Sequence, residues 1–192
     1  GRIIYNLNKE TKEASVKNYV PEAGNNSDVI VIPQSVEELG IIYNVTSIES
    51  EAFSGCSNLT SITIPCGVSQ IGDAVFRGCE KLTTINVDKS NMTYDSRNNC
   101  NAIIETATNT LIIGCKASTI PNSVQTIGLG AFCGLKELTT ITIPNTVTSI
   151  SPLAFSESGL TTVEIPNSVT DIYYGAFQNC TTLSSIYIAN RR

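Results

Sequence analysis

The chain has 192 residues, a length typical of one domain, and only 15% of them are charged, against about 25% in an average soluble protein. Its hydrophobic share of 41% can form a core and excludes wholesale disorder. The sequence has no histidine, which excludes Ser-His-Asp and Cys-His nucleophile pairs, imidazole metal ligands and a histidine general base.

Charge and hydropathy exclude two further classes of protein. The net charge is −5, and 12 basic residues are scattered among 17 acidic ones, a pattern that argues against nucleic-acid binding. No apolar run approaches the roughly 20 residues of a membrane-spanning helix, so we expect no transmembrane segment. The chain begins with Gly1 rather than Met, and we presume that an export signal has been removed.

In chain order, residues 1–45 are predicted to form an N-terminal lead-in with an interrupted first repeat, which starts at Pro33 and breaks off after Val36. Repeats are predicted over 46–188 and a short C-terminal tail over 189–192. The repeat period is 22 or 23 residues and is marked by Phe53, Phe76, Phe132, Phe155 and Phe177. The wider step between Phe76 and Phe132 predicts a degenerate repeat with an insertion over 88–120.

The repeat reads P-x-x-V-x-x-I-x-x-x-A-F-x-x-C-x-x-L-x-x-I-x-I. Its L-x-x-I-x-I end has the alternation of a strand, and the proline that follows cannot donate to a ladder and ends the strand. The V-x-x-I and A-F parts are predicted to return through a short strand or turn, with Phe filling the coil. One such unit cannot bury its own apolar faces, so the copies must stack on each other. The pattern therefore predicts a parallel β solenoid.

The insertion contains the segment AIIETATNTLII, which is predicted to form a β-hairpin with its turn between Ala107 and Thr108. This turn would place Cys100 opposite Cys115, where a disulfide would imply an oxidising compartment. Cys56, Cys79 and Cys180 occupy one repeat slot and are expected to be buried thiols. A metal site is not expected, because the chain has neither a C-x-x-C pair nor histidine.

This unit resembles the BspA-like leucine-rich repeats of bacterial surface proteins. The segment 4–16 looks like the lead-in of these proteins, and 91–115 is similar to a hairpin inserted between their repeats. The resemblance implies a mainly β or α/β leucine-rich-repeat solenoid, a right-handed curved coil stack with a parallel sheet on its concave face. It also implies a secreted or cell-surface bacterial protein that adheres to host cells, neighbouring cells or matrix proteins.

On the concave sheet, the x positions of L-x-x-I-x-I would face outward and form a broad, nearly uncharged face. The expected contact residues for a protein or glycan partner are Thr140, Thr142, Thr162, Glu164, Ser185 and Tyr187. Exposed aromatic side chains such as Tyr187 tend to anchor interfaces. Threonine also suits exposed strand positions in the absence of any ligand, which is the alternative reading of this face. A second alternative places recognition on the hairpin within 91–115.

Three functions remain at this point. The first is macromolecular binding, without a cofactor and without catalysis. The second is an architectural spacer that projects other domains. The third is a carbohydrate-active enzyme, which is disfavoured because such enzymes use two carboxylates and the concave positions offer only Glu164. We expect a monomer or a weak end-to-end association, because Arg191–Arg192 stand where another coil could begin and an uncovered strand edge invites pairing.

Overall fold

The structure is a computed structural model that describes residues 1–189. The chain forms two compact units: residues 1–82 with 86–95, and residues 83–85 with the part from 96 onward. The predicted lead-in of residues 1–45 shares the first unit with the repeats that follow it. Most of the predicted tail, including Arg191–Arg192, lies outside the described residues.

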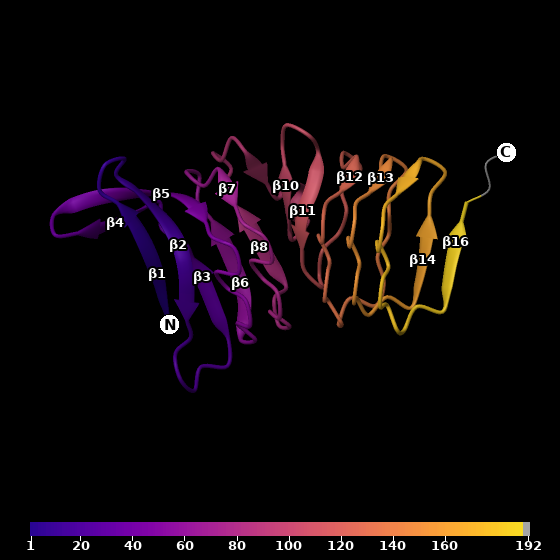
Figure 1. Cartoon of the computed structure of the whole chain (residues 1–192), viewed down its shortest axis with the longest axis horizontal. Helices are drawn as coiled ribbons and strands as arrows, with labels where there is room; N and C mark the ends of the chain where they lie inside the picture. The colour runs from indigo at the N-terminus through magenta and orange to yellow at the C-terminus, as the bar shows by residue number, and fades with distance from the viewer. Residues whose placement is uncertain (190–192) are drawn as a thin grey trace. The chain divides into compact units, whose positions relative to one another are not determined.

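The first unit contains two sheets (Figure 1). One has the order β1 (Arg2–Asn8), β2 (Glu13–Val20), β5 (Ile41–Ile48) and β4 (Ser35–Glu38), with β7 (Gln70–Ile71) also pairing with β5. In the other, β3 (Asp28–Val31) pairs in parallel with β6 (Leu59–Ile64). Strand β8 (Thr84–Val87), whose residues are divided between the two units, and strand β9 (Tyr94–Asp95) of the first unit follow along the chain. The lead-in thus supplies β1 and β2, an antiparallel pair that starts the first sheet.

The second unit begins with the 3-10 helix η1 (Arg97–Asn99) and the predicted hairpin, formed by β10 (Ala102–Glu105) and β11 (Thr110–Gly114). Short parallel strands then extend from β11: β12 (Thr126–Ile127), β13 (Ser149–Ile150) and β15 (Asp171–Ile172). Each is the last two residues of a V-x-x-I segment. A second sheet pairs β14 (Thr162–Ile165) in parallel with β16 (Ser185–Ile188). Successive repeats therefore add one coil after another, as the pattern predicts.

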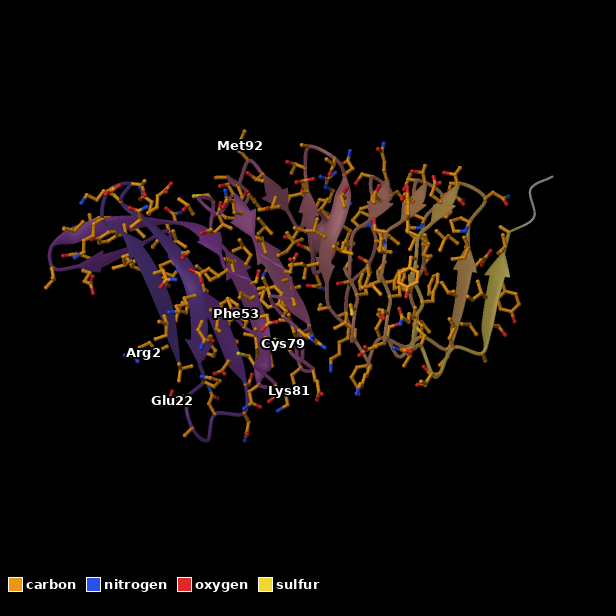
Figure 2. The ribbon with its side chains drawn as sticks, in the orientation of Figure 1. Arg2, Glu22, Phe53, Cys79, Lys81 and Met92 are labelled. Atoms are coloured by element: carbon orange, nitrogen blue, oxygen red, sulfur yellow. The ribbon has the colours of Figure 1, made fainter. Side chains whose placement is uncertain are left out.

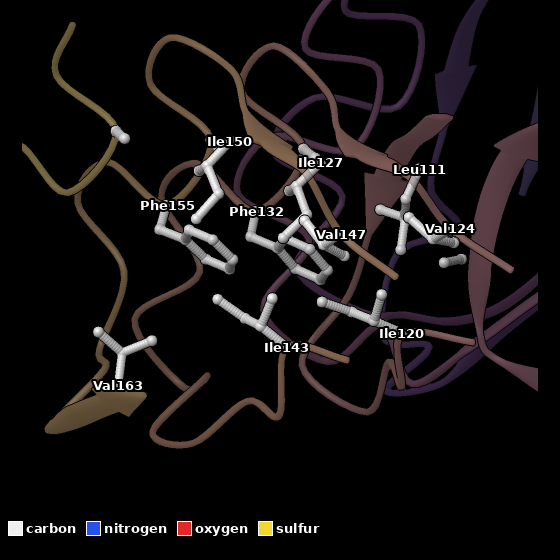
Figure 3. Packing of buried hydrophobic residues seen from close by; sticks show 14 of the residues in the cluster. Leu111, Ile120, Val124, Ile127, Phe132, Ile143, Val147, Ile150, Phe155 and Val163 are labelled. Carbon is white, nitrogen blue, oxygen red and sulfur yellow. The ribbon is translucent and has the colours of Figure 1, made fainter. Parts of the chain in front are cut away.

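The apolar repeat positions of the second unit form one buried cluster (Figure 3). The Phe132 and Phe155 rings are stacked with their centroids 5.1 Å apart, and Phe177 follows Phe155 at 5.3 Å. Backbone bonds join the same turns, since Phe132 N donates to Ala154 O and Phe155 N to Ala176 O. In the first unit, Phe53 lies between Phe76 and Tyr19, so a tyrosine of the lead-in extends the aromatic stack.

One repeat slot requires a left-handed backbone. The residue two places after each phenylalanine has a positive φ, whether it is Gly55, Gly78, Gly134, Glu157 or Asn179. Glycine adopts this conformation without a steric penalty, whereas a side chain with a Cβ is strained there. The repeat motif keeps glycine at this slot in three of five coils for that reason.

Replacing Glu157, whose φ is 58°, with glycine should relieve this strain. We expect Glu157→Gly to raise the free energy of unfolding by about 0.5–1 kcal/mol, the gain being reduced by the larger entropy of glycine in the unfolded chain. Urea denaturation of both proteins measures the difference. A loss of stability in the variant would contradict the strain assigned to this slot.

The expectation of one broad L-x-x-I-x-I sheet is wrong for part of the second unit. The copy at 138–143 does not form a strand, and β14 pairs with β16 alone. The loop between Phe155 and Leu160 is one residue shorter than the loop between Phe132 and Leu138. The shorter loop draws Gly159 close to the preceding coil, where its N–H donates to Leu135 O at 3.0 Å, and the ladder ends soon after.

Candidate functional site

The six predicted contact residues lie in the second unit, on three successive L-x-x-I-x-I segments. We call these residues the threonine face. Thr162 pairs with Ser185, and Glu164 pairs with Tyr187, across the parallel strands β14 and β16. Thr140, Thr142, Thr162, Glu164 and Tyr187 are exposed and Ser185 is half-buried. The alternation that exposes them buries Val163 and Ile165 against the core, so the predicted in-and-out pattern is confirmed for β14.

A groove of about 500 Å³ lies between the 138–143 segment and β14. Four of the predicted residues line it, namely Thr140, Thr142, Thr162 and Glu164. The other lining residues are Ile141, Ile143, Asn145, Pro166, Asn167 and Ala189. Glu164 is the one charged residue among them, so the groove is lined by three threonine hydroxyls and a single carboxylate.

Along this groove, the described backbone groups of the two neighbouring coils are not paired with each other. The bond from Thr161 N to Thr139 O, 3.1 Å long, is the last that joins the two coils on this side, counting bonds within residues 1–189. By contrast, the equivalent strands of the first unit stay paired from Asp28 to Val31, and Ile32 N still donates to Thr63 O. The groove is therefore a place where neighbouring L-x-x-I-x-I segments separate. Sequence analysis missed this feature, and the one-residue deletion before Leu160 was the available signal.

The inserted hairpin is part of the core. Ala102, Ile103, Ile104 and Leu111 are fully buried, and β11 pairs with the first short strand of the next repeat. Arg97 stabilises the hairpin turn by donating a hydrogen bond to Asn109 Oδ1 at 2.8 Å. The hairpin geometry was predicted correctly. Recognition by the segment 91–115, in which Met92 is 89% exposed, stays a prediction.

The proposed disulfide is absent from the structure. Cys100 and Cys115 are buried thiols that are not joined to each other. Instead, the Cys100 thiol donates to Ala102 O and the Cys115 thiol to Asn101 O. The antiparallel register does bring the two segments together, with Ala102 opposite Gly114, but a register bulge follows between Ile103 and Ile104.

The cysteine at the repeated position is buried where a further coil covers it. Cys56 and Cys79 are buried, and Figure 2 shows Cys79 near Phe53, whose carbonyl accepts its thiol hydrogen bond. Cys180, in the last described coil, is only half-buried. Burial raises the pKa of Cys79 to about 12 and also raises the pKa of Cys56.

Because the thiolate is the reactive form, a raised pKa and burial protect Cys79 from alkylation. We expect iodoacetamide at about pH 8 to modify the exposed Cys133 in the folded protein and to leave Cys79 and Cys56 unmodified. Peptide mass spectrometry identifies the modified sites, and unfolding in guanidinium chloride is the control in which all cysteines react. Equal rates for Cys79 and Cys133 in the folded protein would contradict the assignment.

The first unit has a separate hollow of about 760 Å³. Its lining is mostly polar: Asn6, Leu7, Asn8, Lys9, Glu10, Glu13, Ala14, Ser15, Thr46, Ser47, Ser69 and Gln70. Beside it, Asn6 Nδ2 donates to Glu49 Oε1 at 2.7 Å and the Ser15 hydroxyl donates to the same oxygen. Sequence analysis did not find this hollow, although the polar residues Asn6, Asn8, Glu13 and Ser15 alternate along the predicted lead-in.

The described residues hold neither a metal-binding cluster nor a membrane-spanning helix. Among the described residues, no three Cys, Asp or Glu side chains are grouped so that they could hold a metal ion. The part of the chain that the structure describes also contains no helix of sufficient length and hydropathy to cross a membrane.

Similarity to known proteins agrees with this architecture. The family model of the BspA type leucine rich repeat region matches six copies over residues 31–113 and 112–191. No protein of curated function matches the chain.

Similar solved structures include those of three bacterial leucine-rich repeat proteins. A leucine-rich repeat protein from Bacteroides ovatus is 30% identical, with a TM-score of 0.51 over 97% of this chain and 40% of its own. A leucine rich cell surface protein from Faecalibacterium prausnitzii is 26% identical, with a TM-score of 0.51 over 96% of this chain and 52% of its own. A leucine-rich repeat protein from Eubacterium ventriosum is 26% identical, with a TM-score of 0.64 over 77% of this chain and 46% of its own.

The chain thus spans about half the length of these proteins or less. Its family match extends over most of the sequence. The chain belongs to the BspA-type leucine-rich repeat family.

Proposed function

We propose that this protein is an exported bacterial module that binds a protein or glycan on a host or neighbouring cell surface through its threonine face. The observation that carries the proposal is the groove at the centre of this face, lined by four of the six residues expected to make contact. Tyr187, with 61% of its surface exposed, stands beside Glu164 on the adjacent strand and offers an aromatic anchor next to the groove.

The chemistry of the face favours binding without catalysis. Glycoside hydrolysis uses a pair of carboxylates, and the groove is lined by one. Affinity would come from many modest contacts on a preformed surface, which avoids the ordering cost that a flexible binder incurs. The similar protein from Faecalibacterium prausnitzii is a leucine rich cell surface protein, which supports the proposed location.

The test is a binding screen of the purified chain against immobilised matrix proteins and a glycan array. A Thr162→Lys, Tyr187→Ala double variant removes the aromatic anchor and puts a long charged side chain at the groove. Thr148→Lys is the matched control, because Thr148 is also exposed but lies beside β13. We expect saturable binding that falls at least about tenfold in the double variant and persists in the control.

Two results would overturn the proposal. Binding that the double variant retains in full would place the site away from the threonine face, with the hollow of the first unit as the next surface to mutate. Absence of saturable binding across the panel by folded protein would favour the architectural spacer.

A further inference from the structure

We propose that the groove binds an extended peptide that carries a basic side chain, and that this peptide pairs with the free edge of β14 as an added strand. This inference rests on the proposed function, because both use the threonine face. It adds the class of partner and the way in which that partner is held.

The argument starts from the direction of the backbone groups in β14. On the side of β16, Thr161 O accepts from Ser184 N at 2.9 Å and Ile165 O accepts from Ala189 N at 3.0 Å. Successive residues of a strand direct their N–H and C=O groups to opposite edges. The backbone groups of Thr162 and Glu164 therefore point away from β16, toward the 140–143 segment.

On that side, the groove separates β14 from the 140–143 segment. Within the described residues, no backbone bond links the 140–143 segment to Thr162 or Glu164. The β14 wall of the groove thus presents backbone donors and acceptors that, among the described residues, have no backbone partner in the unbound protein. An unpaired strand edge is a template for another strand, and the main-chain bonds of an added strand supply affinity in this mode of peptide recognition.

The size and charge of the groove narrow the occupant further. The wall formed by residues 140–143 spans about 13 Å at about 3.3 Å per residue, which suits about four residues of extended peptide. Glu164 supplies the only charge in the lining, and its carboxylate would pair with a Lys or Arg of the peptide. A glycan could bond to the hydroxyls, but it has no repeating amide to match the edge of β14.

The test begins with selection of a phage-displayed random heptapeptide library on the full chain. The strongest binder is synthesised in three forms: unmodified, and N-methylated at one or the other set of alternate residues. N-methylation removes amide donors without changing side chains. We expect the unmodified peptide to contain Lys or Arg and at least one methylated form to bind about tenfold more weakly or worse.

Variants locate the binding. Glu164→Gln removes the charge at nearly constant shape and should weaken the basic peptide, while Thr162→Lys should block the groove. Thr148→Lys is the matched control, and circular dichroism verifies that each variant is folded. Equal affinity of all three peptide forms, or of Glu164→Gln and the unchanged protein, would overturn the inference, as would selection that yields no peptide.

The two proposals fail in different ways. Suppose that no peptide binds, but a glycan or matrix protein binds the unchanged protein and binds the Thr162→Lys, Tyr187→Ala variant more weakly. This result would support the threonine face as the site and would rule out the added strand. A peptide whose binding survives both Thr162→Lys and the double variant would reject the face itself.

Discussion

Phe155→Ala is expected to lower the free energy of unfolding by about 3–5 kcal/mol. Phe155 is fully buried, and its ring is stacked between Phe132 at 5.1 Å and Phe177 at 5.3 Å with interplanar angles of 5°. Truncation would lose the burial of the ring, leave a cavity inside the coil and remove two ring contacts at once. Urea denaturation followed by far-UV circular dichroism measures the loss.

Two controls separate burial from aromatic content. Tyr174→Ala removes an aromatic side chain that is 81% exposed in the next coil, and should change stability by less than about 0.5 kcal/mol. Phe177→Ala should fall between the two, because Phe177 is only partly buried. A loss below about 1 kcal/mol for Phe155→Ala would contradict the role of the ring stack in holding successive coils together.

Gly159→Ala is expected to destabilise the protein by about 1–3 kcal/mol. A Cβ at Gly159 would collide with the carbonyl oxygen of Lys136 in the preceding coil, and a backbone atom cannot move aside as a flexible side chain can. The collision would also stretch the bond from Gly159 N to Leu135 O, which is 3.0 Å long. Urea denaturation again provides the measurement.

Gly134→Asn is the matched control for Gly159→Ala. A Cβ at Gly134 meets no atom within 4 Å, and asparagine already occupies the same repeat slot at position 179 with a φ of 58°. We expect a loss below about 1 kcal/mol, since asparagine tolerates this backbone conformation. Equal losses in the two variants would show that close approach of the coils at Gly159 is not the cause.

Much of the fold follows from local pattern. The V-x-x-I segments became short strands, and the insertion became a hairpin with Glu105 opposite Thr110, close to the predicted turn. These elements were predictable because the spacing of apolar residues determines which side chains enter the core. A repeated sequence therefore buries the same positions in each repeat.

Backbone pairing was less predictable, because it depends on the neighbouring coil as well as on the segment itself. Residues 59–64 read LTSITI and residues 138–143 read LTTITI, yet only the first forms a strand. The first lies beside β3, while the second precedes a repeat that is one residue shorter. Nearly identical sequences thus differ in structure because their partners differ.

The candidate site was predictable to the same extent. Alternation along L-x-x-I-x-I identified the exposed residues of the threonine face, because side chains of a strand point alternately to opposite sides. The groove between Thr142 and Thr162 could not be read from this alternation, since it arises from separation of two coils. The possible Cys100–Cys115 disulfide stays a prediction: the structure leaves both cysteines as thiols, and opposition in a hairpin does not by itself decide whether two sulfurs reach bonding geometry.

The most direct test of the open strand edge is residue-resolved amide hydrogen exchange by NMR on the unbound protein. The account predicts rapid exchange at Thr162 and Glu164, whose N–H groups face the groove, and slow exchange at Val163 and Ile165, whose N–H groups face β16. Comparable slow exchange at all four amides would contradict it, because β14 would then be paired on both edges and the groove would have no free backbone to offer a partner.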